Sequence, residues 1–313
     1  MARRSVILLI LHIAFFTAAI PLQSDAQPDT ILNKRGLLVL QPFAEYNSSA
    51  IYYDSTGKTI TRIERPNEQF GYVTDLSVYT VGVAARYNAS DVLTLHARLP
   101  FSIATLNENY SASLIGIIKP RRNLSATGMQ YYQVGMEYLL PSKKSRTSAL
   151  LNIRTAPSFT SPEANADSNS FTPFMPGGTV MVSAGLQSNI KFSNTDVIGR
   201  FEYHYRSGDL RDLASISLEG RIYSIGDAII RCGAQGVFTT GATRGVRGFN
   251  TQTFPLYESY ISAGAGFMMF LSDELYFDVN YTIRVVGTNT WGLGTINTTV
   301  GFALPVAEHN TTN

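Results

Sequence analysis

The segment LYFDVNYTIRV, residues 275–285, alternates apolar and polar side chains without a break. Its apolar and aromatic positions are Phe277, Val279, Tyr281, Ile283 and Val285, and its polar positions are Asp278, Asn280, Thr282 and Arg284. Successive side chains of a β-strand point to opposite faces of the sheet, so this segment predicts a strand with one apolar and one polar face. A soluble β-sandwich or a membrane barrel could contain such a strand, and one strand alone does not distinguish them.

The same alternation recurs along the chain and predicts twelve strands. They lie near residues 36–46, 72–87, 92–103, 128–140, 147–157, 178–192, 196–206, 213–224, 227–239, 257–271, 274–286 and 292–304. A dozen alternating segments of about ten residues are typical of transmembrane barrels. The predicted fold class is therefore all-β, a transmembrane antiparallel up-and-down barrel of about twelve strands.

Short and longer connections alternate between these strands. The short ones are near 88–91, 141–146, 193–195, 225–226 and 272–273. The longer ones are near 47–71, 104–127, 158–177 and 240–256, and two of intermediate length are near 207–212 and 287–291. Outer-membrane barrels have tight periplasmic turns at one end and longer external loops at the other. A soluble sandwich has no need of this rhythm, so the spacing favours a membrane barrel with both termini in the periplasm.

The first residues have the features of an export signal. Arg3 and Arg4 precede an apolar run at 6–20, and Ser-Asp-Ala at 24–26 fits a cleavage site. The run is shorter than the roughly 20 residues that a spanning helix needs. We therefore expect a signal peptide at 1–26 and one barrel domain at 27–313, located in the outer membrane of a Gram-negative bacterium with lipid as its partner.

The composition agrees with a barrel and argues against other classes of protein. Mean hydropathy is +0.01 and 15% of the residues are charged, as expected when half of each strand faces water. After the signal, no apolar run is long enough for a spanning helix. A net charge of +2 is too small to indicate nucleic-acid binding. Cys232 is the only cysteine, so the chain can form no intramolecular disulfide and no cysteine cluster for a metal.

Two hairpins resemble those of the outer-membrane transporter family associated with the meta-pathway of phenol degradation. The first hairpin contains Ala85-Arg86-Tyr87-Asn88, Asp91-Val92-Leu93-Thr94-Leu95 and Leu99-Pro100-Phe101, and the second contains residues 133–140, QVGMEYLL, followed by a strand at 149–157. The resemblance implies a barrel that transports hydrophobic or aromatic compounds and is loosely related to long-chain fatty-acid transporters. The chain lacks the Asn-Pro-Ala hatch motif of those transporters.

Charged side chains line the lumen if the polar face of each strand points inward. The predicted pore-lining residues are Arg86, His96, Arg98, Arg154, Lys191, Arg200, Glu202, His204, Glu219, Arg221, Arg231, Asp278 and Arg284. With Arg206, Glu45 and Glu137 included, basic residues on this face outnumber acidic ones nine to five. A narrow passage with low-dielectric walls would focus this excess and concentrate anionic solutes. Alternatively, the charges pair across neighbouring strands and fill the lumen, because a twelve-stranded barrel is near the size that side chains can fill.

The sequence predicts no metal, cofactor or catalytic site. His96 and His204 lie on different strands, and no third ligand follows at a recognisable spacing. The chain contains no Gly-x-Ser-x-Gly elbow, so a barrel hydrolase is the least favoured function.

Pro100 interrupts the third predicted strand, where it cannot donate a hydrogen bond to the sheet. Such a proline indicates a bulge, an edge or a strand end. Strand termination is the favoured interpretation, and the alternative is an opening in the wall through which an apolar solute leaves sideways into the membrane.

The sequence thus predicts a passive outer-membrane channel for small molecules. Hydrophobic, aromatic and anionic solutes all remain candidates for its substrate. A barrel with a filled lumen that serves as a structural or surface-binding protein is the alternative. The residues indicate no oligomeric state.

Overall fold

The structure is a computed structural model that describes residues 34–53, 56–61, 63–64, 71–110, 122–141, 146–156, 180–207, 211–223, 228–240, 259–288 and 290–306. The predicted signal peptide lies outside these residues. Within them, no helix is long and apolar enough to cross a membrane.

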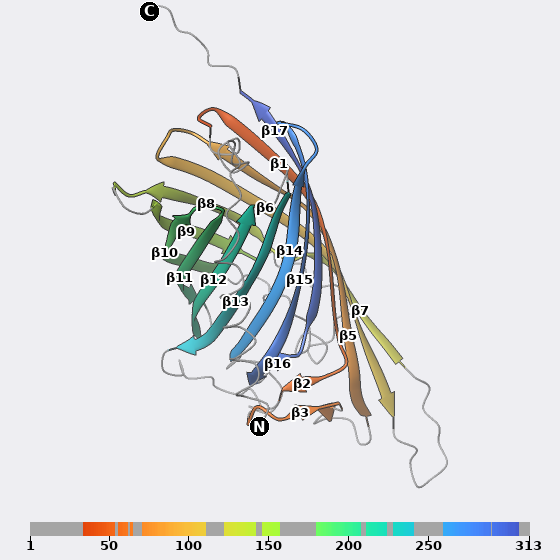
Figure 1. The fold of residues 1–313 in the computed structure, drawn as a ribbon. Coiled ribbons are helices and arrows are strands. Elements are labelled where there is room, and N and C mark those ends of the chain that lie inside the picture. Colours follow the sequence, from red (N-terminus) through yellow and green to blue (C-terminus); the bar gives the residue numbers. More distant parts are fainter. Residues whose placement is uncertain are drawn as a thin grey trace, which may run out of the picture.

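Long antiparallel strands form the body of the molecule (Figure 1). They are β1 (Leu37–Ser49), β5 (Gly71–Asn88), β6 (Leu93–Tyr110), β7 (Arg122–Met129), β8 (Tyr132–Leu139), β9 (Arg146–Thr155), β10 (Val180–Phe192), β11 (Thr195–Arg206), β12 (Asp212–Tyr223), β13 (Ala228–Thr240), β14 (Ser259–Phe270), β15 (Leu275–Thr288) and β17 (Gly294–Pro305). The strands β7 and β8 both pair with β6 and together form one position of the sheet, so the strand positions number twelve, as predicted.

The sheet closes on itself. Each strand pairs with its neighbour in the chain, and β1 pairs with both β5 and β17. In the register, Leu38 lies opposite Tyr87 of β5 and opposite Leu304 of β17. Closure leaves the barrel without exposed sheet edges along these ladders, which is the arrangement that lipid requires.

The predicted alternation of connections is confirmed. The strands β5, β8, β10, β12 and β14, which precede the short connections, end at one side of the barrel, and β1, β6, β9, β11, β13 and β15 end at the opposite side. We call these the short-turn end and the long-loop end. The predicted loop 104–127 is too long, because residues 104–110 and 122–127 continue β6 and β7. Backbone pairing beyond the membrane needs no apolar face, so the alternation that marks strands fades there.

Pro100 lies in the middle of β6 rather than at its end, so the predicted strand termination is wrong. Between the pairs Arg98–Gln133 and Phe101–Met129, two residues of β6 face three residues of the strand formed by β7 and β8. The extra residue is a β-bulge, and the backbone N–H of the residue after Met129 donates to the Pro100 carbonyl oxygen at 3.0 Å. The sheet accommodates the missing N–H of the proline by this bulge.

The outer face carries the apolar and aromatic side chains, as predicted. Large exposed aromatic residues are Tyr79, Phe101, Tyr132, Tyr138, Phe192, Tyr203, Tyr205, Phe238, Phe267, Tyr281 and Phe302. Aliphatic side chains between them are also exposed, with Val134 and Leu218 each at 58%. An apolar surface of this extent requires a partner or a membrane, and lipid around a barrel supplies one.

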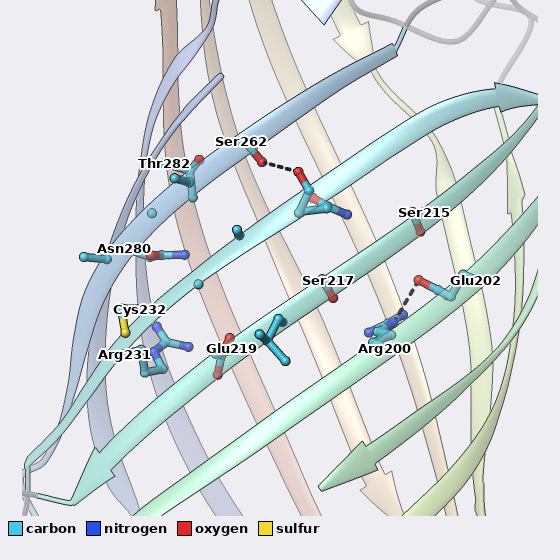
Figure 2. Close-up of a pocket in the computed structure, with 17 residues that line it drawn as sticks. Arg200, Glu202, Ser215, Ser217, Glu219, Arg231, Cys232, Ser262, Asn280 and Thr282 are labelled. Carbon is cyan, nitrogen blue, oxygen red and sulfur yellow. Dashed lines mark hydrogen bonds and ion pairs between the residues drawn. The ribbon is translucent and has the colours of Figure 1, made fainter. Parts of the chain in front are cut away.

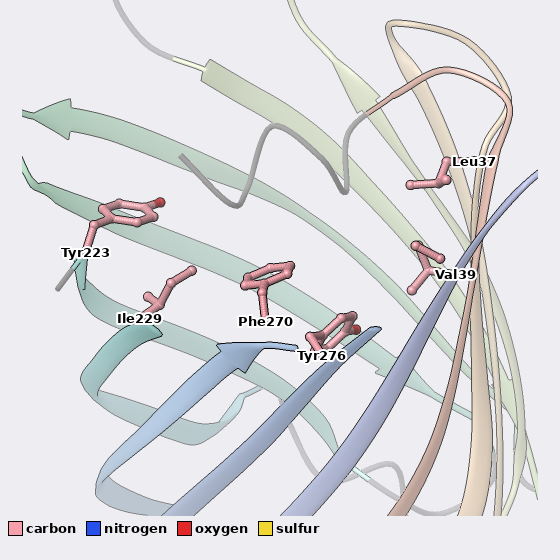
Figure 3. Close-up of a cluster of buried hydrophobic side chains, with 7 residues drawn as sticks. Leu37, Val39, Tyr223, Ile229, Phe270 and Tyr276 are labelled. Carbon is pink, nitrogen blue, oxygen red and sulfur yellow. The ribbon is translucent and has the colours of Figure 1, made fainter. Parts of the chain in front are cut away.

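Apolar side chains meet inside the barrel at the short-turn end (Figure 3). This short-turn cluster consists of Leu37, Val39, Tyr223, Ile229, Phe270, Tyr276 and Ala303. It draws on six neighbouring strands, and the Gln41 side chain donates a hydrogen bond to the Tyr276 hydroxyl. The ring of Tyr276 lies against Gly301 of β17, where a Cβ would fall 2.0 Å from a ring carbon. The inner face at this end is therefore packed and apolar.

A second, three-stranded sheet lies at the long-loop end. It contains β2 (Tyr52–Tyr53), β3 (Thr59–Ile60) and β16 (Thr290–Trp291), while the short β4 (Ile63–Glu64) extends the main sheet beside β5. The Tyr53 hydroxyl donates to the backbone oxygen of Arg284 at 3.2 Å, which fixes the small sheet to β15. Burial raises the pKa of Tyr53, so its hydroxyl stays protonated and keeps this hydrogen bond at neutral pH.

Candidate functional site: the lumen

The inner face of the barrel divides into two regions of different character. The network wall is formed by β6, β8, β9, β10 and β11, and its inner residues are His96, Arg98, Gln133, Asn152, Arg154, Ser183, Glu202 and His204. The cavity wall is formed by β12 to β15, and its inner residues are Ser217, Glu219, Arg231, Gly233, Gln235, Ser262, Gly264, Gly266, Asn280 and Thr282. The pairing register of neighbouring strands explains which inner side chains meet on each wall.

On the network wall, a glutamine lies in one row between two arginines that come from the strands on either side of it. In the ladders, Arg98 of β6 lies opposite Gln133 of β8, which lies opposite Arg154 of β9. Arg154 Nε donates to Gln133 Oε1 at 2.9 Å, and its guanidinium stacks over the Tyr131 ring with 4.5 Å to the centroid. Both contacts bind the arginine side chain in place against the wall.

On the other side of this row, Arg98 reaches β1. Its guanidinium lies 4.2 Å from the centroid of the Phe43 ring and 3.6 Å from Glu45 Oε2. A cation over an aromatic face is attracted by the ring quadrupole. Arg98 is therefore held between an aromatic ring and a carboxylate, and it connects the network wall with β1.

Asn152 is the centre of the network. It is 5% exposed, and its Oδ1 lies 2.5 Å from His96 Nε2, while its Nδ2 donates to Glu202 Oε1 at 3.3 Å. His96 reaches Asn152 across β8 because Gly135 stands between them, where a Cβ would lie 2.2 Å from Asn152 Oδ1. The glycine thus allows side chains from alternate strands to touch.

His204 extends the network to two further strands. Its Nδ1 lies 2.7 Å from Ser183 Oγ on β10, and its Nε2 lies 2.9 Å from Ser215 Oγ on β12. Both ring nitrogens are engaged by hydroxyls, an arrangement that links strands. Among the residues that the structure describes, no group of three His, Cys, Asp or Glu side chains could hold a metal ion.

Ion pairs link four of the predicted acidic residues to four of the basic ones. They are Arg98 with Glu45, Arg200 with Glu202, Arg221 with Glu219, and Arg231 with Asp278. Two of these pairs, at 2.8 Å for Arg200 and 2.6 Å for Arg221, join residues two positions apart on one strand. These two pairs form within single strands, because i and i+2 share one face of a strand.

The remaining pair, Arg231 with Asp278, spans β14. In the register, Arg231 lies opposite Gly266, and the neighbouring strand β15 provides Asp278. The absence of a side chain at Gly266 leaves room for the arginine to cross. Arg231 and Asp278 are 15% and 17% exposed, so this pair is well shielded from water.

Three predicted pore-lining residues lie toward the ends of the barrel. Arg86 lies close to the short-turn end of β5, and Lys191 is exposed beside the turn between β10 and β11. Arg284 lies toward the long-loop end, where it donates to Thr290 Oγ1 and its guanidinium lies 3.9 Å from the centroid of the Tyr260 ring. These charges act on the mouths of the lumen rather than on its middle.

The cavity wall contains a hollow of about 350 Å³ (Figure 2). Its floor contains two glycines: in one row Glu219, Gly233, Gly264 and Thr282 lie side by side on β12 to β15. Gly266 lies in the next row. A Cβ on Gly264 would fall 2.6 Å from the backbone oxygen of Tyr281, so the close approach of β14 and β15 requires glycine there.

Polar side chains stand around this floor. Those that line the hollow are Ser215, Ser217, Glu219, Arg231, Gln235, Ser262, Asn280 and Thr282 of the cavity wall, together with Arg200 and Glu202 of β11 at the edge of the network wall. Our sequence analysis placed the charged members in the lumen but did not single out the serines, Gln235, Asn280 or Thr282 as a site. The signal that could have located them is the run of glycines at inner positions of two adjacent predicted strands, since these leave space beside the polar side chains.

No protein-family model matches this sequence, and no curated protein matches it. An outer-membrane channel from Pseudomonas putida F1 is similar in structure, with a TM-score of 0.60 and 11% identity over 87% of this chain and 96% of that chain. The translocator domain of the autotransporter NalP from Neisseria meningitidis has a TM-score of 0.49 and 12% identity over 86% of this chain and 88% of its own. The Pseudomonas putida toluene transporter TodX has a TM-score of 0.46 and 11% identity over 92% of each chain. The first of these likenesses shows that the chain has the fold of an outer-membrane β-barrel.

Proposed function

We propose that this protein is a passive outer-membrane channel through which small molecules cross without an energy source. The observation that carries the proposal is the polar hollow on the cavity wall, inside a closed barrel whose outer face is apolar. A water-accessible polar lumen within a lipid-facing barrel is the architecture of diffusion channels. The similar protein from Pseudomonas putida F1 is described as an outer-membrane channel, which supports the proposal.

The sequence supports two predictions about the class of solute that this channel takes. The resemblance of two hairpins to the family associated with phenol degradation implies hydrophobic or aromatic solutes, and this relation stays a prediction. The basic excess on the inner face implies a preference for anions, which also stays a prediction. Arg98, Arg200, Arg221 and Arg231 are ion-paired in the structure, and each pair reduces the net positive charge that the inner face offers to an anion.

Ion conductance of the purified protein in planar lipid bilayers tests the proposal. We expect stepwise current through the wild-type protein, because water and ions can occupy the polar hollow. The absence of current from correctly folded, inserted protein would contradict an open channel.

A filled lumen is the second candidate, and the short-turn cluster favours it. Its buried apolar side chains, with Tyr276 2% exposed, lie where a passage would leave the barrel. A protein closed in this way would act through its loops as a structural or surface-binding protein. Tyr276→Ala then distinguishes the two candidates: current that occurs only in this variant indicates that the cluster closes the lumen.

Lateral exit near Pro100 remains a proposal for apolar solutes. It is supported by the bulge opposite Pro100, since bulges weaken strand pairing locally. Cysteines at Leu99 of β6 and Tyr132 of β8 would lie beside the bulge on the two strands that it separates. A disulfide between them should slow uptake of an apolar solute into vesicles and leave the ion current unchanged. Unchanged uptake in the cross-linked protein would contradict this route.

A further inference from the structure

We propose that the hollow on the cavity wall binds a neutral, polyhydroxylated small molecule. This inference rests on the proposed channel function and names the class of solute that the channel takes. It depends on three properties of the hollow: its balance of charge, its unused hydrogen-bonding groups and its lack of aromatic side chains.

The charges that line the hollow cancel. Arg200 and Arg231 contribute two positive charges, and Glu202 and Glu219 contribute two negative ones. Each of them is also ion-paired, Arg200 to Glu202 within the hollow, Glu219 to Arg221 and Arg231 to Asp278. A charged solute would have to compete with these pairs, whereas a neutral one leaves them intact. The hollow therefore favours a solute without net charge.

Four side chains of the hollow offer hydrogen bonds that the protein does not use. Ser217, Gln235, Asn280 and Thr282 have no side-chain hydrogen-bond partner among the residues that the structure describes. They come from three strands, β12, β13 and β15, and Figure 2 labels Ser217, Asn280 and Thr282 among them. Hydroxyl and amide groups both donate and accept hydrogen bonds. Their natural partner is a solute that carries several hydroxyl groups, each of which also donates and accepts.

The lining gives an apolar or aromatic solute little to bind. None of the residues that line the hollow is aromatic, so no ring stacking is available there. A hydrocarbon in the hollow would displace water from hydroxyl, amide and charged groups without replacing their hydrogen bonds, which is unfavourable. Apolar solutes are thus disfavoured at this site even though the barrel resembles hydrocarbon channels in fold.

The size of the hollow agrees with this class of solute. About 350 Å³ lies near the lower limit of the volumes that small-molecule sites have in proteins. A linear or cyclic polyol fits this range and could reach groups on all three strands.

Saturation-transfer NMR with sorbitol tests the inference on protein in a detergent that has no sugar head group. We expect saturable transfer to sorbitol from the wild-type protein. Thr282→Val keeps the shape of the side chain and removes its hydroxyl, and it should weaken the apparent affinity about threefold to tenfold, the effect of one hydrogen bond. Thr299→Val is the matched control, because Thr299 lies on the inner face of β17 outside the hollow, and it should leave the affinity unchanged.

Three results would overturn the inference: no transfer to sorbitol, equal loss in the two variants, or transfer to toluene that Thr282→Val abolishes. The ion current in planar bilayers distinguishes this failure from failure of the proposed function. Current without sorbitol binding refutes the solute class and leaves the channel intact. Sorbitol binding without current supports the site and refutes the channel.

Discussion

The network wall and the cavity wall are built from the same alternating strands but use their polar side chains differently. On the network wall, His96, Asn152 and Glu202 bind one another across intervening strands. On the cavity wall, Asn280 and Thr282 stand beside glycines and bind no described side chain. Buried polar groups must be paired, and exposed ones are solvated by water. The difference teaches that the polar side chains of one half of the lumen bind one another, whereas those of the other half leave hydrogen bonds available to water or to a solute.

Glycine contributes to both walls, with opposite results. Gly135 lies between His96 and Asn152 and lets them meet, so it helps to fill the lumen. Gly233 and Gly264 lie next to each other, and because neither has a side chain they leave a hollow among the polar residues around them. What surrounds a glycine decides whether it closes space or leaves it open.

The largest effect on stability is expected from a charge on the lipid-facing side of a strand, in comparison with a charge on its inner side. Val279 points outward and Asn280 points into the hollow from the same strand. Val279→Arg should lower the free energy of unfolding by about 2–4 kcal/mol if it lies near the bilayer midplane. Asn280→Arg should cost much less, because water solvates the new charge. Urea titrations of both variants in lipid vesicles measure the difference, and equal losses would show that the strand register or the membrane placement is wrong.

The two asparagines compare the walls directly. Asn152→Leu removes hydrogen bonds from the half-buried His96 and the buried Glu202, which should cost about 1–3 kcal/mol of unfolding free energy. Asn280→Leu breaks no hydrogen bond to a described residue and should cost less. The same urea titrations apply. A larger loss for Asn280→Leu would mean that the cavity wall, not the network wall, holds the barrel together.

The smallest effect concerns charge selectivity. Replacement of Arg200 and Arg284 by glutamine should reduce any anion preference in reversal-potential measurements, because both contribute to the basic excess. The preference should also fade with salt, since the Debye length falls from about 30 Å at 0.01 M to about 3 Å at 1 M. A preference that is unchanged between these salt concentrations would exclude electrostatic focusing by the lumen.

The architecture was predictable from the sequence because lipid imposes a simple rule. Every second residue of a spanning strand must be apolar, and the alternation in 275–285 follows this rule. The rhythm of turns and loops then predicted the number of strands and the order in which they pair. All of the predicted pore-lining residues lie in strands, but their inward positions say nothing about which of them touch.

The contacts within the lumen could not be predicted, because they depend on how far neighbouring strands are shifted against each other. Arg200 binds Glu202 of its own strand, while Arg231 crosses β14 to reach Asp278. The sequence places these charges on the inner face but does not show which of them lie within reach of one another. Likewise, the bulge at Pro100 depends on one extra residue in the partner strand, which alternation in β6 alone does not reveal.

Cysteine modification during current recording tests most directly whether the passage follows the cavity wall. In a Cys232→Ala background, Ser217→Cys places a thiol in the hollow, and Ser183→Cys places one in the network wall, where Ser183 is 2% exposed and bonded to His204. We predict that a charged methanethiosulfonate reagent reduces the current through Ser217→Cys and leaves that through Ser183→Cys unchanged. An unchanged current through Ser217→Cys after its complete modification, as measured by mass spectrometry, would contradict a passage along the cavity wall.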